Sequence, residues 1–98
     1  MSIAKQFGKN LHRARKAVGL SQEQTAVRAS VHRTEIGLLE RGERTPRIDT
    51  AIKLASVLGV APADLFEGIV WSPGATTLGQ FTAAAEPPEP EKGSRPAS

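Results

Sequence analysis

The side chains of this sequence that could do chemistry are mainly basic, and they gather in its first half. Residues 1–47 hold ten Lys and Arg against four acids, a balance of +6, whereas residues 48–98 hold three against six, a balance of −3. Cationic side chains on one side of a protein favour contact with a polyanion such as nucleic acid. An ordinary solvated surface would also carry these charges, so the charge alone leaves both interpretations open.

The composition excludes several kinds of reactive site. Cys is absent, which excludes disulfides, thiolate catalysis and zinc sites built on Cys. His12 and His32 are too few and too far apart in the sequence to form a metal site on their own. The sequence shows no nucleophile–base arrangement, and Gly37 and Gly42 do not make a phosphate-binding glycine loop. We therefore expect a protein that is not an enzyme and holds no metal or cofactor.

The elements that position the basic side chains belong to one small domain. The chain has 98 residues and a mass of 10.4 kDa, enough for a single core. Only 4% of its residues are aromatic, so that core must be aliphatic, as in a helical bundle. No apolar run approaches the roughly 20 residues of a membrane span, and the first residues lack the pattern of a secretory signal. We expect a cytoplasmic protein, associated with the nucleoid and not with a membrane.

Apolar residues spaced three and four apart predict five short helices and therefore an all-α fold. Ser21 and Gln24 form the pattern of a capping box before the second helix, and Pro62 suits the first position of the fifth. The predicted helices cover residues 3–18, about 22–29, about 32–41, about 49–58 and a single turn from 62. Residues expected to face the core from the last three are Ile36, Leu39, Ile52, Leu54, Ala55, Leu58, Leu65 and Phe66.

A change of composition near Trp71 divides the chain into a domain, residues 1–70, and a C-terminal extension, residues 71–98. Five of the seven prolines fall in the extension, which predicts a flexible tail. The extension could be ordered as far as about residue 81, because Leu78 and Phe81 could pack on the domain or on another subunit. Beyond that point it is expected to be disordered.

The second and third predicted helices are short and separated by a break of a few residues, as in a helix-turn-helix, whose second helix enters the major groove of DNA. Several sequence blocks over about residues 3–68 resemble, in order and with matching spacing, the lambda-repressor/Cro-like (xenobiotic-response-element type) helix-turn-helix family. The main blocks are Gly19–Ala26 (GLSQEQTA, against the family's GLSQEELA), Val31–Ile36, Leu39–Gly42, Leu54–Val60 and Asp64–Phe66. The resemblance implies a compact lambda-repressor-like domain of five helices that binds DNA.

Two residues at the start of the second helix are expected to contact the DNA backbone. Unpaired N–H groups at a helix N-terminus suit a phosphate oxygen, and the amide of Gln22 adds a donor beside Ser21. The resemblance implies that Gln22 clamps the DNA backbone and braces the helix that reads the bases. The alternative is that Gln22 is merely a neighbour of the capping box.

Side chains of helix 32–41 are the candidates for contact with base edges. The guanidinium fork of Arg33 fits O6 and N7 of guanine, a contact that discriminates by roughly 1–3 kcal/mol, although Arg33 could instead bind a phosphate. Thr34 can give a hydrogen bond or offer its methyl group to thymine. Leu38 could touch a thymine methyl group or add to the core. His32 is expected to cap the helix, with base contact as its lesser role.

The turn after this helix is the expected place of further phosphate contacts. In the family that the sequence resembles, this region touches the sugar-phosphate backbone, which implies that role for Arg41, Arg44 and Arg47. Solvated surface charges are the alternative. Gly37 could let the backbone approach a phosphate or a base edge, or be merely tolerated at a cost of roughly 1 kcal/mol to the helix.

Two acids of the third helix need partners. The resemblance implies that Glu40 forms a partly buried ion pair with Arg15, which would lock the first helix against the third. Glu35 could accept a hydrogen bond from N4 of cytosine, or it could pair with Arg28 or Arg33. The sequence does not decide between these alternatives.

Together these observations predict a sequence-specific transcription regulator that binds double-stranded DNA and acts as a repressor. One reading helix covers only a few base pairs, so a homodimer on two half-sites about one helical turn apart is expected. The alternative is an antitoxin or a bridging protein-interaction module of the same fold, with a protein partner bound through the C-terminal tail. Residues expected at the dimer surface are Leu65, Phe66, Ile69, Val70 and Trp71.

Overall fold

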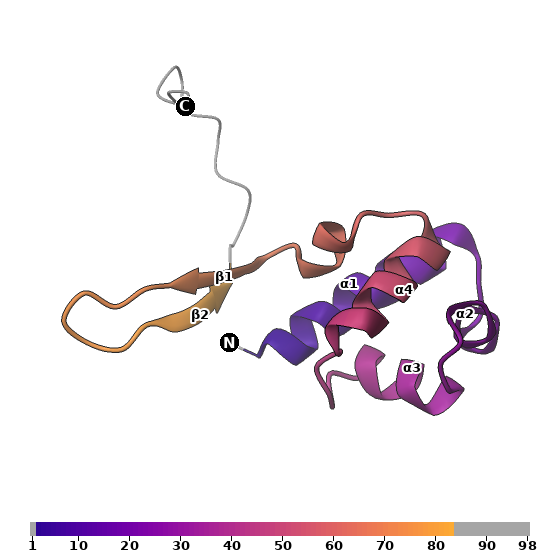
Figure 1. The fold of residues 1–98 in the computed structure, drawn as a ribbon, viewed down its shortest axis with the longest axis horizontal. Helices are drawn as coiled ribbons and strands as arrows, with labels where there is room; N and C mark the ends of the chain where they lie inside the picture. Colours follow the sequence, from indigo (N-terminus) through magenta and orange to yellow (C-terminus); the bar gives the residue numbers. More distant parts are fainter. Residues whose placement is uncertain (1, 84–98) are drawn as a thin grey trace, which may run out of the picture.

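The computed structural model describes residues 2–83, in which short turns join successive helices and a β-hairpin ends the described chain (Figure 1). The helices pack together, and the hairpin extends from them as an arm. Most of the tail predicted to be disordered, residues 84–98, lies outside the described residues. The elements are α1 (Ile3–Val18), α2 (Gln22–Ala29), α3 (Arg33–Glu40), α4 (Ile48–Leu58), the 3-10 helix η1 (Pro62–Phe66), β1 (Ile69–Ser72) and β2 (Gln80–Ala83).

The starts of α2, α3 and α4 differ in how their free N–H groups are satisfied. At α2 the predicted capping box is confirmed: Ser21 Oγ accepts from the Gln24 N–H at 3.0 Å, and Gln24 Oε1 accepts from the Ser21 N–H at 2.9 Å. His32 and Arg47 stand at the N-caps of α3 and α4, but neither side chain makes a capping hydrogen bond within the described residues. The expectation that His32 caps its helix is therefore wrong.

The core is aliphatic, as predicted, and every helix contributes to it. Ile36 and Leu39 of α3 are buried as expected. Ile52 of α4 was expected to face the core but is 52% exposed, because the buried face of that helix runs through Leu54 and Leu58 instead. Burying apolar surface is the main favourable term in folding. The buried apolar residues are Phe7, Leu11, Ala26, Ala29, Ile36, Leu39, Ala51, Leu54, Ala55, Leu58 and Leu65.

Two features correct the prediction of an all-α fold with five α-helices. The predicted fifth helix, Pro62–Phe66, is a 3-10 helix. The chain then forms an antiparallel pair of strands, β1 and β2, in which Trp71 is opposite Phe81. Branched and aromatic side chains at the start of the hairpin favour a pleated strand over a helix. The strand β1 crosses the predicted boundary at residues 70 and 71, and the ordered extension reaches Ala83.

Close backbone contact fixes α3 against α1 at two glycines. A Cβ on Gly8 would lie 2.4 Å from the carbonyl oxygen of Leu39 and 2.8 Å from that of Glu40, so only glycine allows the two helices to meet here. Gly42 has a φ of 73° and would place a Cβ 2.6 Å from Cγ of Lys5. The C-terminal end of α3 is therefore held directly on α1.

A buried amide ties η1 to the first helix. Asn10 is 2% exposed, and its Nδ2 donates to the carbonyl oxygens of Leu65 and Glu67, each at 2.9 Å. A buried donor with satisfied hydrogen bonds stabilises the packing that it joins, whereas an unsatisfied one would destabilise it. The root of the arm is thereby fixed to the helices.

Candidate nucleic-acid interface

The carboxylate of Glu40, at the end of α3, joins three helices. Arg15 of α1 donates to both of its oxygens, from Nε to Oε2 and from Nη2 to Oε1, the latter at 3.0 Å. Gln22 of α2 donates from Nε2 to Oε1 at 3.1 Å, and Nδ1 of His12 lies 3.0 Å from the same oxygen. The pair of Arg15 and Glu40 that the resemblance implied is present in the structure, with side chains only 9% and 5% exposed.

Burial and hydrogen bonding act in opposite directions on Glu40. Burial by itself raises the pKa of its carboxyl group, but hydrogen bonds from Arg15, His12 and Gln22, together with the charge of Arg15, outweigh burial and hold that pKa below its ordinary value. The carboxylate is therefore charged at neutral pH. Because Arg15 also donates from Nη1 to the carbonyl oxygen of Leu20 at 2.8 Å, the same guanidinium fixes the turn between α1 and α2.

The first turn of α3 is exposed on the outside of this anchored framework. Arg33 and Thr34 are both exposed, and neither contributes to the core. Leu38, one turn later, is partly buried. Its burial is therefore intermediate between that of an exposed base contact and that of a core residue, the two alternatives that the sequence left open. His32 is exposed just before the helix begins. Three of the four residues predicted to contact bases therefore lie on one short helix and the fourth, His32, stands at its N-cap, with Arg33 and Thr34 exposed in the first turn.

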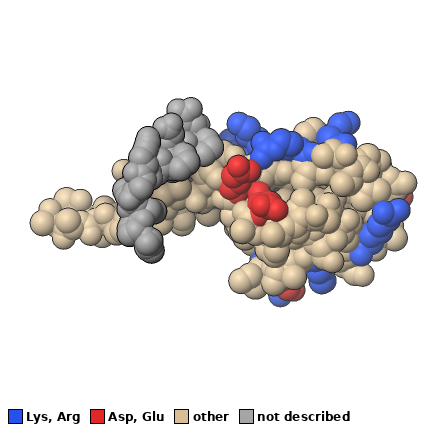
Figure 2. All heavy atoms as spheres, turned by 90° about the horizontal axis from the view of Figure 1, so that it is seen from above, with Lys and Arg blue, Asp and Glu red and all other residues tan. Residues whose placement is uncertain are grey.

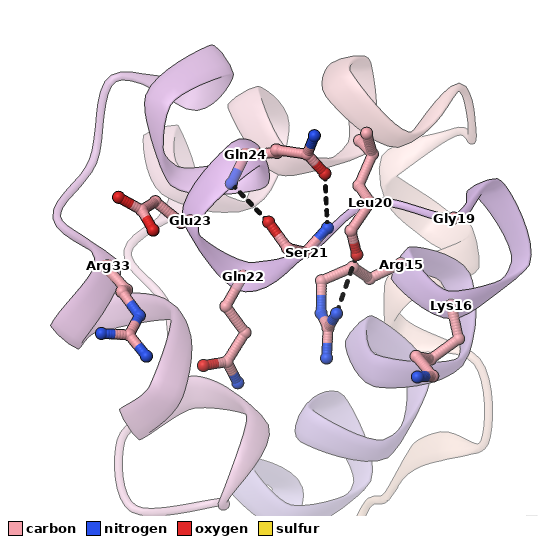
Figure 3. A pocket seen from close by; sticks show the side chains of 9 residues that line it. All are labelled: Arg15, Lys16, Gly19, Leu20, Ser21, Gln22, Glu23, Gln24 and Arg33. Carbon is pink, nitrogen blue, oxygen red and sulfur yellow. Dashed lines mark hydrogen bonds between the residues drawn. The ribbon is translucent and has the colours of Figure 1, made fainter.

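A polar hollow of about 530 Å³ lies beside that turn, at the N-terminus of α2 (Figure 3). Its basic side chains are Arg15 and Lys16 on one side and Arg33 on the other, and the side chain of Gln22 points into the space between them. Ser21 also lines the hollow, although its hydroxyl is engaged in the capping box. The backbone N–H groups of the first turn of α2 open at the same place. This arrangement suits an anionic oxygen.

A second polar hollow, of about 250 Å³, continues along α3. It is lined by Gln22, Arg33, Thr34, Gly37 and Arg41. The guanidinium of Arg41 lies over Gly37, because a Cβ there would be 2.9 Å from Nη1 of Arg41. The absence of a side chain at residue 37 thus leaves room for the arginine side chain one turn further along the helix.

The arginines that follow α3 are partly neutralised by acids. Arg44 donates from Nη1 to Oε1 of Glu35 at 2.6 Å, so Glu35 pairs with neither of the two arginines considered from the sequence. Arg41 donates from Nε to Glu43 at 2.8 Å. Such exposed pairs contribute little to stability, so their side chains remain available to other partners.

The last predicted cation of this region, Arg47, is 82% exposed in its side chain and lies 3.5 Å from a carboxylate oxygen of Asp49.

Among the residues expected at a dimer surface, Leu65 is 1% exposed and belongs to the core, which removes it from any interface. Phe66, Val70 and Trp71 are between 40% and 53% exposed. Ile69 is partly buried beside them.

Comparison with known proteins decides the family. The family model described as helix-turn-helix matches residues 11–65, which span α2, α3 and most of the helical bundle. The chain belongs to this family. In helix-turn-helix terms α2 is the first helix of the motif and α3 the second, so Arg33 and Thr34 lie in the exposed first turn of the motif's second helix.

Relatives of this helix-turn-helix protein are named as regulators. The HTH-type transcriptional regulator y4dJ of Sinorhizobium fredii is 37% identical over 65 residues, which cover 66% of this chain and 84% of the relative. Control protein C.BamHI of Bacillus amyloliquefaciens is 37% identical over 62 residues, covering 62% of this chain and 76% of the relative. The chain is thus a DNA-binding transcription regulator of the helix-turn-helix class.

A solved structure supports the same fold for the helical part. The restriction-modification controller protein C.AhdI from Aeromonas hydrophila is 37% identical, with a TM-score of 0.62, and the match covers 63% of this chain and 94% of that one. The helix-turn-helix family is one of transcription regulators and not of enzymes. Within residues 2–83 no group of three His, Asp or Glu is placed to hold a metal ion, and none of the helices there is suited to cross a bilayer.

The sequence did not reveal two contacts of the helix-turn-helix framework. His12 and Glu40 are 28 residues apart, and no local pattern connects them. Gly8 lies inside an amphipathic helix, where a glycine predicts only a loss of helix stability. The presence of Gly8 within the amphipathic pattern of α1 was the one signal that the backbone of another helix passes close by.

Proposed function

We propose that this regulator is a sequence-specific repressor that binds double-stranded DNA as a homodimer and reads the major groove with α3. The observation that carries the proposal is the exposed first turn of α3, set between two polar hollows that are lined by cationic side chains. An α-helix fits the major groove, where each base pair presents a distinct pattern of donors and acceptors. Arg33 and Thr34 are the side chains that would reach this pattern, with Leu38 and His32 at its borders.

The hollow at the N-terminus of α2 is the proposed seat of one phosphate. The N–H groups of Gln22 and Glu23 precede the capped N–H of Gln24, and neither has an acceptor within residues 2–83. Lys16 adds a positive charge on the opposite wall. Phosphate contacts of this kind position a protein on the duplex without selecting a sequence.

On the other side of the recognition helix, Arg41, Arg44 and Arg47 are proposed to hold the next stretch of DNA backbone. Each is exposed, and their acidic partners are held by side-chain contacts that a phosphate can replace at little cost. Phosphates on both flanks would set the depth and angle at which α3 enters the groove. Base selection would then come from the helix alone.

Two copies are proposed because one recognition helix covers too few base pairs for specific regulation. A two-fold dimer doubles the site, with half-sites about one helical turn apart. Repression follows as the output that needs no further surface: a dimer seated on a promoter blocks access to the DNA beneath it. The names of the relatives, a transcriptional regulator and control proteins, support a role in regulating transcription.

The test of base reading is a selection of bound duplexes from a random pool, followed by affinity measurements on the selected site. The selected sites should have two-fold symmetry. The variant Arg33→Ala should lose roughly 5- to 150-fold in affinity for a duplex with a single half-site, corresponding to 1–3 kcal/mol for one contact, and should lose preference at one guanine of each half-site in the selected sites. Arg28→Ala, an exposed arginine of α2 outside both polar hollows, is the matched control and should keep the preference.

Three results would contradict this proposal. An equal loss for Arg33→Ala on every DNA sequence would make Arg33 a phosphate contact instead of a base contact. A chemical-shift map in which DNA perturbs residues away from the start of α3, or perturbs none at low salt, would refute groove reading by this helix. A tight protein partner recovered with the chain, without any affinity for DNA, would favour the protein-interaction module.

A further inference from the structure

The arm formed by β1 and β2 has one apolar face. Opposite residues of an antiparallel pair lie on the same face, so the pairs Ile69–Ala83 and Trp71–Phe81 share one side, while Val70 and its partner take the other. The rings of Trp71 and Phe81 stack edge to face with centroids 4.9 Å apart. These two aromatic side chains are nevertheless 53% and 42% exposed.

The tip of the arm is exposed, although backbone and indole pack closely just before it. A Cβ on Gly79 would lie 2.8 Å from Cζ2 of Trp71, so the indole ring lies closely over the backbone there. Leu78, beside it, is 94% exposed. A two-stranded hairpin is marginally stable by itself and needs packing against another surface. The apolar face of the arm thus presents the surface that would supply this packing.

An apolar groove of about 380 Å³ continues this face at the root of the arm. Ile69 and Phe81 of the arm form one wall, and Ile3, Phe7, Pro46 and Phe66 form most of the rest. The rings of Phe7 and Phe66 have centroids 5.8 Å apart. Because Phe81 belongs to both, the apolar surface runs without interruption from the groove onto the arm.

The lack of charged side chains on the arm restricts the kind of partner that could cover it. Residues 68–83 contain no Asp, Glu, Lys, Arg or His. The part of the arm that is visible in Figure 2 carries none of the Lys, Arg, Asp and Glu atoms that mark the helical body. Such a surface offers nothing to phosphates or to a charged partner. In a two-fold contact the same surface patch of both copies meets itself, so a patch with charges of one sign would repel its counterpart. An uncharged apolar patch avoids this repulsion.

We propose that the arm and the groove at its root form the surface that joins two copies of this chain. The Trp71 and Phe81 face and the tip at Leu78 of each arm pack against the groove and arm of the other copy. The inference rests on the proposed function in one respect: it locates the contact that would hold two α3 helices at two half-sites. It also removes the buried Leu65, and Val70 on the opposite face of the arm, from the expected interface residues and adds Leu78 and Phe81.

The chain carries its own probe of this contact, because Trp71 is the one tryptophan in the sequence. Raising the concentration of the full chain should shift Trp71 emission to the blue at the same concentrations at which sedimentation shows dimer. Leu78→Glu changes a fully accessible side chain, so it should leave the helical fold intact while weakening self-association at least tenfold. Phe81→Thr, which keeps a residue suited to a strand, should weaken self-association similarly. Val70→Thr, on the opposite face of the same strand, is the matched control and should associate as the parent does.

The outcomes separate this proposal from the proposed function. A parent chain that stays monomeric, or Leu78→Glu and Phe81→Thr variants that dimerise as tightly as the parent, would overturn the arm contact even if DNA is bound. Binding to a duplex with a single half-site tests α3 alone, and the Leu78→Glu variant should bind it as the parent does. A parent that dimerises through the arm but binds no duplex would overturn the proposed function and leave the arm contact standing.

Discussion

Replacing Arg15 by Ala should destabilise the domain more than any other single charge removal in the described residues. The substitution deletes two hydrogen bonds to Glu40 and a third to the carbonyl oxygen of Leu20. It also leaves a carboxylate that is 5% exposed without its positive partner. The loss therefore comes mainly from stranding a buried charge, and not from the attraction that the pair provides.

The magnitude follows from what remains around Glu40. Removing one member of a buried ion pair costs about 3–5 kcal/mol. Gln22 still donates to the carboxylate and His12 still lies beside it, so we expect the lower end of that range, about 3 kcal/mol. For a domain of this size the unfolding midpoint should then fall by roughly 12–24 °C.

Thermal and urea unfolding, followed by circular dichroism, measure this loss, and the double variant Arg15→Met/Glu40→Leu tests its cause. With both charges removed and the volume filled, most of the stability should return. Arg47→Ala removes an arginine whose side chain is 82% exposed and should leave the midpoint unchanged. An Arg15→Ala variant that melts with the parent, or a double variant less stable than Arg15→Ala, would refute the reasoning.

Three further predictions concern pH, packing and salt. The pKa of Glu40 is lowered in the folded state, so its contribution to the free energy of unfolding is complete above the ordinary carboxyl pKa of 4.5 and is lost as the pH falls below that value. The free energy of unfolding in urea should therefore fall more steeply below about pH 4.5 for the parent than for Glu40→Gln. Gly8→Ala should cost about 1–3 kcal/mol in the same assay, since its Cβ would press on backbone oxygens of α3. Arg44→Ala should reduce the slope of log affinity for DNA against log salt by about 1 for each half-site bound, and an unchanged slope would mean no phosphate contact.

The parts of the fold that the sequence predicted well are those governed by local patterns. The capping box of Ser21 and Gln24 involves residues three apart, and the apolar spacing of Ile36 and Leu39 spans a single turn. Within such short distances the helix geometry is known in advance, so residue types decide the outcome. For this reason α2 and α3, and the exposed side chains on α3, could be placed from the sequence.

The parts that failed depend on how elements meet. The sequence could not assign Arg44 as the partner of Glu35, because the path of the turn between them is set by the contact of Gly42 with α1. The spacing of the apolar residues of α4 allows either of two faces to be the buried one, and only the packing shows that the face with Ile52 is turned outward. The hairpin had strand propensity at one strand alone, and a single strand does not specify its partner.

Gln22 illustrates how anchoring and recognition can share one side chain. Its amide nitrogen carries two hydrogens, and the structure uses a bond from this nitrogen to the carboxylate of Glu40. One hydrogen therefore remains for a phosphate oxygen seated over the first turn of α2. Bracing α3 and clamping the DNA backbone, the two roles that the family resemblance implied, are thus compatible. Since Glu40 is held at the same time by Arg15 of α1, three side chains connect the proposed phosphate contact, the proposed recognition helix and the core of the domain.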